Sequence, residues 1–225
     1  MIRHRKKTFE SSYKGLPILT DKDKNLGCYE DMLEILKQQF DEALEKQTRT
    51  FIVRYDVRFP SNHQCHSHSD NKLISEFNAD YMKALRREDF KPQYFMTREQ
   101  SREKHQHHHG ILLLEGKKVH SISTPLDIAE RIWHHKLGLP PPTGKFFQKD
   151  TSHEHLIDAC IRDRQGNIVP NGIMIRKDDP EHEEKLKECF KRASYLCKIN
   201  TKGHTAKGQR EVFASRITHV AKGTK

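Results

Sequence analysis

The 225-residue sequence predicts an α+β fold with a central, mainly antiparallel sheet and flanking helices. Segments with apolar residues at helical spacing are interspersed with short runs of β-branched and aromatic residues, which indicates both helices and strands. Two of the expected strands are joined by a short polar segment and therefore form an antiparallel hairpin. The expected order, strand–helix–strand–strand–helix–strand–strand–helix, is typical of the α+β class.

The first part of the chain predicts an arm, two helices and a strand. Residues 1–27 are basic and polar and contain turn formers, so we expect a basic flexible arm. Residues 29–46 place their apolar side chains near one side at helical spacing, as an amphipathic helix does. Residues 51–60 combine β-branched and aromatic types and end at a proline, which is typical of a strand. Residues 72–88 predict a second amphipathic helix.

The middle of the chain predicts a hairpin and a helix. Residues 94–99 and 107–115 have the composition of strands, and the polar segment between them is short enough for a hairpin loop. Pro125 in a first turn and Gly138 at the end delimit the helix. We expect the two histidines that follow its tryptophan, at positions 134 and 135, to lie at the surface.

The last part of the chain predicts a second hairpin, a helix and a tail. Residues 157–163 and 168–177 flank a Gln-Gly-Asn turn and predict the hairpin, although a proline interrupts it. Residues 180–198 carry apolar side chains along one face of a helix. We expect a single domain over residues 28–200, followed by a basic, mobile tail over residues 201–225.

The charge of the chain favours a polyanionic partner. Lys and Arg number 41 against 31 Asp and Glu, which gives a formal net charge of +10. Such an excess attracts nucleic acid at long range, although a basic protein without such a partner fits the charge alone equally well. Neither a signal peptide nor a run of about 18 apolar residues occurs, so we expect a cytoplasmic protein with no membrane partner. The five cysteines lack CxxC spacing and are expected to be reduced thiols.

Three consecutive histidines precede the aliphatic run of the second hairpin strand. Side chains alternate along a strand, so His107 and His109 share one face and His108 points to the other. Glu99 ends the preceding strand, and the hairpin can bring it close to these imidazoles. Two imidazoles and one carboxylate suit a divalent ion such as Mg²⁺, Mn²⁺ or Zn²⁺. The alternative is that these are surface histidines in a sequence that contains 16 of them.

A tyrosine and a lysine near the end of the last helix are candidate catalytic residues. Tyr195 is expected roughly opposite the apolar face, beside Lys191 and Arg192. A phenol, with an ordinary pKa of about 10, is a poor nucleophile at neutral pH and needs a polarised electrophile and nearby positive charge. Lys198, one helical turn further on, can supply that charge. The alternative is an ordinary exposed tyrosine.

Two loops add weaker candidates. Lys145 and Lys149, with Phe146 and Phe147 between them, could bind single-stranded DNA through charge and stacking, or could be a basic loop with a hydrophobic anchor. Residues 62–68 contain three histidines and a cysteine that could bind zinc. Their spacing matches no standard zinc finger, so a solvated loop is the favoured interpretation.

These motifs together resemble the HUH endonucleases, which initiate rolling-circle replication, plasmid transfer or single-strand transposition. In that family two histidines separated by one residue precede an apolar strand, as in residues 107–114, and a tyrosine is followed three residues later by a lysine, as in residues 195–198. Glu99 has the spacing of the acidic metal ligand of many viral members. With the strand at residues 51–60, the chain resembles inovirus-type, YagK/YfjJ-like replication initiators over roughly residues 30–200.

The chain departs from the family pattern in two places. The residue between the paired histidines is usually apolar but is His108 here, and His105 offers a second HxH frame with His107. We favour His107 and His109 because the aliphatic run directly follows His109. Inovirus initiators can use two tyrosines, whereas this motif contains one.

The resemblance implies a mechanism, an HUH-type palm resembling an RRM fold, and partners. A divalent metal on Glu99, His107 and His109 would polarise the scissile phosphate of single-stranded DNA. Tyr195 would attack it, leaving a 5'-phosphotyrosine and a free 3'-hydroxyl, and Lys198 would steady the phosphate. Because no P-loop motif occurs, a host helicase would unwind the origin and a host polymerase would extend the primer. The DNA contacts would come from four basic residues, Lys145, Lys149, Lys191 and Arg192.

Two other functions are compatible with the sequence. A DNA-binding protein of a mobile element could recognise an origin or operator without cutting it. A structural zinc protein would bind zinc tightly and would not cleave DNA.

Overall fold

The computed structural model describes residues 5–60, 71–99, 106–144, 155–163, 165–200, 202 and 209–218. Its main helices are α1 (Glu30–Lys46), α2 (Lys72–Arg87), α3 (Ser123–Lys136) and α4 (His182–Ser194). The main strands are β5 (Arg49–Arg58), β6 (Gln93–Glu99), β7 (His107–Glu115), β8 (Ile157–Asp158), β9 (Ile173–Arg176) and β10 (Val212–Ala214).

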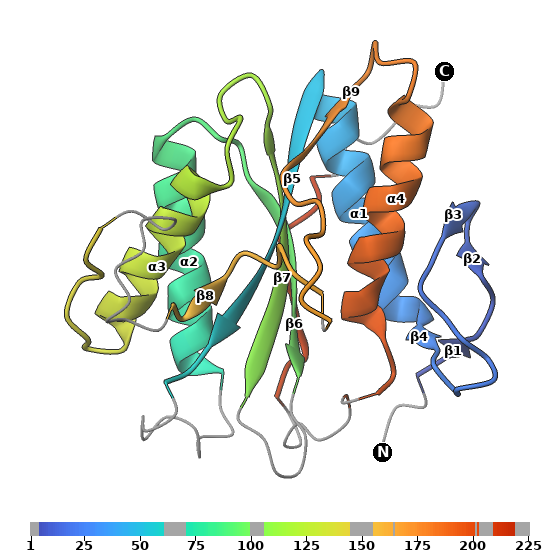
Figure 1. The fold of residues 1–225 in the computed structure, drawn as a ribbon, viewed down its shortest axis with the longest axis horizontal. Helices are drawn as coiled ribbons and strands as arrows, with labels where there is room; N and C mark the ends of the chain where they lie inside the picture. The colour runs from blue at the N-terminus through green and yellow to red at the C-terminus, as the bar shows by residue number, and fades with distance from the viewer. Residues whose placement is uncertain are drawn as a thin grey trace.

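In the described part of the chain these strands form one six-stranded sheet in the order β10-β6-β7-β5-β8, and β9 also pairs with β5. Every pairing in the sheet is antiparallel. Helices α1 and α4 cover one face, and α2 and α3 cover the other (Figure 1). The α+β fold with a mainly antiparallel sheet and flanking helices is therefore confirmed.

Strand β7 lies at the centre of the sheet and contributes to two separate cores. Its side chains alternate, so that Leu112 packs with Trp133 on the α2 and α3 side, whereas Ile111 packs with Phe190 on the α1 and α4 side. Because both faces are covered, the strand is an almost continuous apolar run. The same alternation assigns each of the preceding histidines to a face.

The segment before α1 differs from the expected flexible arm. Residues 5–29 contain four short strands, β1 (Lys7–Thr8), β2 (Ser12–Tyr13), β3 (Leu16–Pro17) and β4 (Cys28–Tyr29). They lie on the outer side of α4 (Figure 1). Ile18 is only 3% exposed in the core, and Leu19 N donates a hydrogen bond to Ser194 Oγ at 2.8 Å. Few apolar residues anchor this segment, so its mainly polar composition did not indicate that it is ordered.

The region after residue 200 also differs from the expected mobile tail, because residues 212–214 form β10. This strand extends the sheet beyond β6, and Phe213, opposite Met96, is 4% exposed. A strand of three residues with one buried aromatic side chain is too short to show an alternation in the sequence.

The expected second hairpin is confirmed only next to its turn, where Arg162 and Ile168 form an antiparallel bridge and Val169 N donates a hydrogen bond to Ile161 O at 2.9 Å. Strands β8 and β9 do not pair with each other but lie one after the other along the same edge of β5. Asn171 fills the gap between them: its Oδ1 accepts a hydrogen bond from Arg54 N at 2.9 Å, and its Nδ2 donates one to Arg54 O at 2.7 Å. The side-chain amide thus replaces a strand partner at Arg54. Local pairing is therefore limited to the residues next to the glycine turn, and the strands on either side of it both pair with β5.

Candidate functional site

The hairpin of β6 and β7 places three expected metal ligands on one face of the sheet. Glu99 is paired with His107 in the register, and His109 is two residues further along β7. By strand alternation these side chains lie on the face that α1 and α4 cover. His108 belongs to the opposite face.

His109 lies between two carboxylates. Its Nε2 is 2.5 Å from Glu99 Oε2, and its Nδ1 is 2.7 Å from Asp56 Oδ1. Burial lowers the pKa of His109, but the two carboxylates outweigh this and raise it above the ordinary value. Burial raises the pKa of Asp56, but His109 and Arg54 outweigh this and hold it below the ordinary value. The contacts therefore favour an ionised Asp56 beside a protonated His109.

Asp56 was not predicted from the sequence. It lies directly opposite His109 because β5 pairs with β7. Its position in the middle of an expected strand, where a carboxylate is unusual, was the one available signal.

Tyr195 reaches the same face from the end of α4. The helix ends at Ser194, and a 3₁₀ turn (Tyr195–Cys197) follows, so the helix is shorter than expected. Leu196 and Cys197 are buried and anchor this turn. The ring of Tyr195 meets the ring of His109 edge-on, with centroids 5.7 Å apart. The structure thus brings Tyr195 together with the histidine strand.

Lys198 connects the tyrosine to the acidic side chain. Its Nζ donates a hydrogen bond to Tyr195 Oη at 2.5 Å and lies 2.6 Å from Glu99 Oε1. Its backbone is extended and pairs with Cys28, so the short strands before α1 help to position it. Contact with Tyr195 was expected from helical spacing, but a turn followed by extended backbone provides it.

Arg54 is a second residue that was not predicted. Its guanidinium carbon is 4.7 Å from the centre of the Tyr195 ring, and its Nη2 is 3.7 Å from Asp56 Oδ1. A guanidinium over an aromatic face is a favourable cation–π arrangement. It adds permanent positive charge next to the tyrosine.

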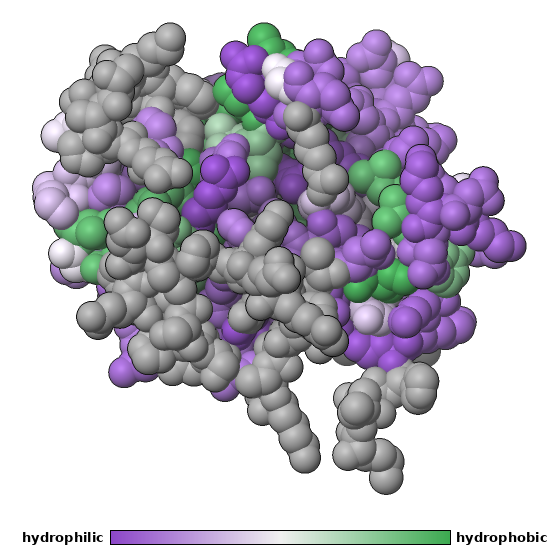
Figure 2. All heavy atoms as spheres, turned by 60° about the horizontal axis from the view of Figure 1, so that its bottom comes forward, coloured by the Kyte–Doolittle hydropathy of each residue, from purple (hydrophilic) through white to green (hydrophobic). Residues whose placement is uncertain are grey.

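A pocket of about 790 Å³ with many charged side chains opens beside these residues. His109, Asp56 and Tyr195 line it. Figure 2 turns the lower end of Figure 1 forward, and the described surface there is mainly hydrophilic with smaller hydrophobic patches. Five cations line the pocket, namely Arg54, Arg58, Arg162, Lys191 and Arg192, together with four carboxylates, Asp56, Asp158, Asp163 and Glu188. The expected DNA contacts Lys191 and Arg192 therefore lie beside the tyrosine.

Comparison with known proteins assigns the chain to a family. Residues 8–136, more than half of the chain, match the family described as the YagK/YfjJ C-terminal domain. The chain belongs to the YagK/YfjJ family. The matching segment contains Asp56, Glu99, His107 and His109 and ends before Tyr195. No curated protein matches the chain.

Other candidate residues of this YagK/YfjJ-family chain lie away from this site or outside the described residues. His108 is fully buried on the opposite face, between the rings of Phe59 and Phe213. Burial holds its pKa well below the ordinary value. Lys145, Lys149, residues 62–68 and the alternative ligand at position 105 lie outside the described residues. None of the helices in the described ranges is long and apolar enough to cross a membrane.

The three expected ligands, Glu99, His107 and His109, are the residues that would hold a divalent metal. Among the described residues no group of three or more His, Cys, Asp or Glu side chains could hold a metal ion as they stand. The donor types nevertheless suit a divalent ion, and Glu99 and His109 are already in contact. Burial lowers the pKa of His107, and neighbouring His109 and Arg58 lower it further, which favours the neutral form that binds metals. The three residues therefore have donor types that suit a divalent metal and lie on one face of the sheet, and Glu99 and His109 are already in contact.

Proposed function

We propose that this member of the YagK/YfjJ family is an HUH-type nicking and joining enzyme for single-stranded DNA, which initiates rolling-circle replication of a phage or other mobile element. One observation carries the proposal. A continuous series of contacts runs from Tyr195 through Lys198 and Glu99 to His109. A nucleophile, a cation and two candidate metal ligands from distant parts of the chain are thus in contact at one site, and Tyr195 and His109 line the pocket beside it.

Tyr195 would be the nucleophile. Its phenolic oxygen forms a bond to the scissile phosphorus, the bond from phosphorus to the 3'-oxygen breaks, and the phenolic proton passes to solvent while the leaving oxygen takes up a proton. The products are a 5'-phosphotyrosine and a free 3'-hydroxyl. Joining is the reverse reaction, so no ATP is required. Lys198 and Arg54 lie beside the tyrosine and would offset the negative charge that develops there.

A divalent ion held by Glu99, His107 and His109 would supply polarisation of the scissile phosphate. Asp56, on the Nδ1 side of His109, would orient the imidazole so that Nε2 faces the ion. The pocket cations would bind the DNA phosphates on either side of the cleaved bond.

The test is covalent capture of DNA. Purified protein is incubated with labelled single-stranded DNAs from its own genetic neighbourhood, with Mn²⁺ or EDTA, and run on a denaturing protein gel. We expect a metal-dependent adduct that is absent from Tyr195→Phe and His107→Ala. Tyr13→Phe is the matched control, because Tyr13 is a partly exposed tyrosine that donates a hydrogen bond to Glu34 and lies outside the pocket. This variant should still form the adduct.

A DNA-binding protein without nuclease activity is the second candidate. The observation that favours it is that His109 already forms contacts with carboxylates on both sides, which stabilise the site without a metal. In that case the protein would bind the DNAs but form no adduct with any divalent metal. This result would reject the tyrosine mechanism.

A further inference from the structure

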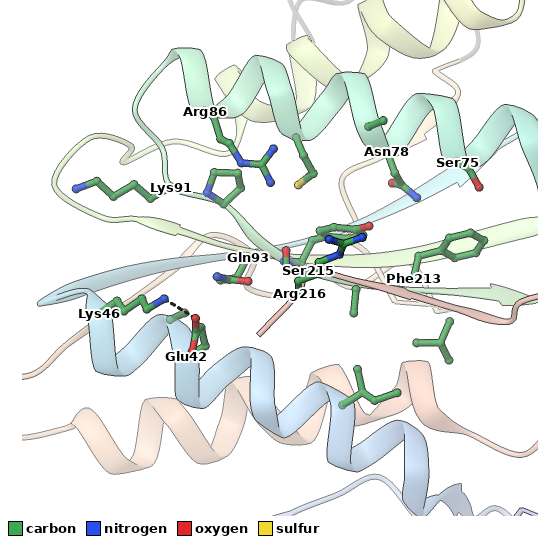
Figure 3. Close-up of a pocket in the computed structure, with 18 of the residues that line it drawn as sticks. Glu42, Lys46, Ser75, Asn78, Arg86, Lys91, Gln93, Phe213, Ser215 and Arg216 are labelled. Atoms are coloured by element: carbon green, nitrogen blue, oxygen red, sulfur yellow. Dashed lines mark hydrogen bonds and ion pairs between the residues drawn. The ribbon is translucent and has the colours of Figure 1, made fainter. Parts of the chain in front are cut away.

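A second groove runs along the opposite edge of the molecule. It has a volume of about 980 Å³ and lies between α1 and α2, where β10 and the start of β6 form the edge of the sheet (Figure 3). Gln93 and Tyr94 line it at the first residues of β6, whereas Glu99 is the last residue of that strand. At ~3.3 Å per residue, the groove lies about 20 Å from Glu99 along β6.

The groove is strongly basic. One carboxylate lines it, Glu42, which already contacts Lys46 at 2.5 Å and Thr218 Oγ1 at 2.7 Å. Five cations line it, namely Lys46, Arg86, Lys91, Arg210 and Arg216. In the part of the chain that the structure describes, its three arginines make no ion pair. Arginines without a carboxylate partner suit phosphate groups, which they bind through two parallel hydrogen bonds.

Buried amide groups form the inner part of the groove. Asn78 and Gln47 are 3% and 4% exposed, and neither Asn78 Oδ1 nor Gln47 Oε1 has a hydrogen-bond partner among the described residues. The buried Oε1 of Gln93 is also without one. In Figure 3 Asn78 points from α2 into the groove and Gln93 lies near its centre. Buried oxygens without donors are costly, so a ligand with N–H groups would stabilise them.

Two aromatic residues, Tyr94 and Phe213, also line the groove. Burial raises the pKa of Tyr94, whereas the charges of Arg210 and Arg86, which line the same groove, act to lower it. Arg210 also lies 5.2 Å from the centre of the Phe213 ring. Aromatic rings and guanidinium planes are surfaces on which nucleobases stack.

We propose that this groove binds a nucleotide unit, with its phosphate on the arginines and its base beside Tyr94 and the amides of Asn78, Gln47 and Gln93. Nucleobases carry both N–H donors and ring acceptors, which Asn and Gln amides recognise in pairs. The nucleotide could belong to a DNA strand or be free in solution. The site is separate from Tyr195, so the proposal does not depend on DNA cleavage.

The first experiment measures binding of a labelled 20-nucleotide single-stranded DNA by fluorescence anisotropy in EDTA. The variant is Arg86→Glu/Arg216→Glu, and the matched control is Lys83→Glu/Arg87→Glu, which changes the charge equally at exposed residues outside the groove. We expect at least a tenfold loss of affinity in the groove variant and less than a threefold loss in the control. A plot of log affinity against log salt has a negative slope, and its magnitude should decrease by about 0.7 for each phosphate that the variant no longer binds. Equal losses in both variants would overturn the proposal.

The second experiment follows the side-chain amide signals of ¹⁵N-labelled protein, with Asn78→Leu to assign the Asn78 signal. The probes are the four deoxynucleoside monophosphates, the 20-nucleotide DNA and inorganic phosphate. Shifts with the monophosphates would identify free nucleotide as a sufficient ligand, and shifts with the DNA alone would identify a nucleotide within a strand. No shift with either, or the same shifts with inorganic phosphate, would reject a nucleotide site.

The adduct assay separates this site from the proposed function. A protein that forms the Tyr195 adduct yet shows no groove effect would refute the groove alone. A protein that loses nucleotide binding in the groove variant but never forms an adduct would refute cleavage alone.

Discussion

Glu130 provides the sharpest test of how the sheet edge beside the pocket is held. This carboxylate is 3% exposed on α3. Its Oε2 accepts a hydrogen bond from Ile157 N at 2.8 Å, and its Oε1 accepts one from Leu156 N at 3.0 Å and faces His134 Nε2 at 3.1 Å. These contacts attach β8 to α3, and β8 in turn pairs with β5 at Asp56.

Glu130→Gln keeps the shape of the side chain but replaces one acceptor oxygen with an N–H₂ donor. One of the two backbone N–H groups of β8 then loses its acceptor and faces a donor. Hydrogen bonds to charged groups contribute ~1.5–3 kcal/mol, and an unsatisfied buried donor costs a similar amount. We expect the free energy of unfolding to fall by about 2–4 kcal/mol, or the Tm to fall by roughly 4–16 °C.

Urea unfolding followed by tryptophan fluorescence measures this loss. Trp133 is the sole tryptophan, is fully buried, and lies less than one turn from Glu130, so its emission reports on this contact. Glu45→Gln, at an exposed position of α1, is the control and should change stability by less than ~0.5 kcal/mol. If Glu130→Gln unfolded at the same urea concentration as the control, the proposed role of the carboxylate in holding β8 would be wrong.

Three further predictions concern packing, hydrogen bonding and thiol chemistry. A Cβ at Gly110 would lie 2.5 Å from the buried Tyr55 ring, so Gly110→Ala should cost ~1–3 kcal/mol in urea unfolding, and less in a Tyr55→Leu background. Asn171→Ala leaves backbone groups of β5 unpaired and should cost about 1–3 kcal/mol in the same assay. Burial raises the pKa of Cys28 to about 11 and of Cys189 to about 12, so at pH 8 on the order of one thiol in a thousand or fewer is ionised. Mass spectrometry should find both unalkylated by iodoacetamide until urea unfolds the protein; rapid native labelling would contradict this burial.

Much of the fold was predictable because its signals are local. The strand composition of β6 and β7 and the short polar segment between them predicted the hairpin, and the structure shows its register, with Glu99 opposite His107. The apolar faces of α1 and α2 were evident from helical spacing. His134 shows the limit of this reasoning: it was expected at the surface of α3, yet it is 5% exposed beside Glu130.

The candidate site was predictable only in part. Glu99, His107 and His109 lie on neighbouring strands of one hairpin, so sequence spacing brings them together. Tyr195 was recognised with Lys198 as a motif, but its contact with the histidine strand depends on how α4 packs against the sheet. The groove at the β10 edge had no signal in the sequence, because its residues come from separate segments of the chain.

The main helices and strands, and the face of β7 on which each histidine lies, follow from local sequence patterns, since strand and helix periodicities are properties of short segments. The contact of Asp56 with His109, the packing of residues 5–29 beside α4 and the addition of β10 to the sheet depend instead on the tertiary fold. These contacts join segments far apart in the chain. Their partners are selected by the combined burial of both surfaces, and periodicity within one segment carries no information about which distant segment will cover it.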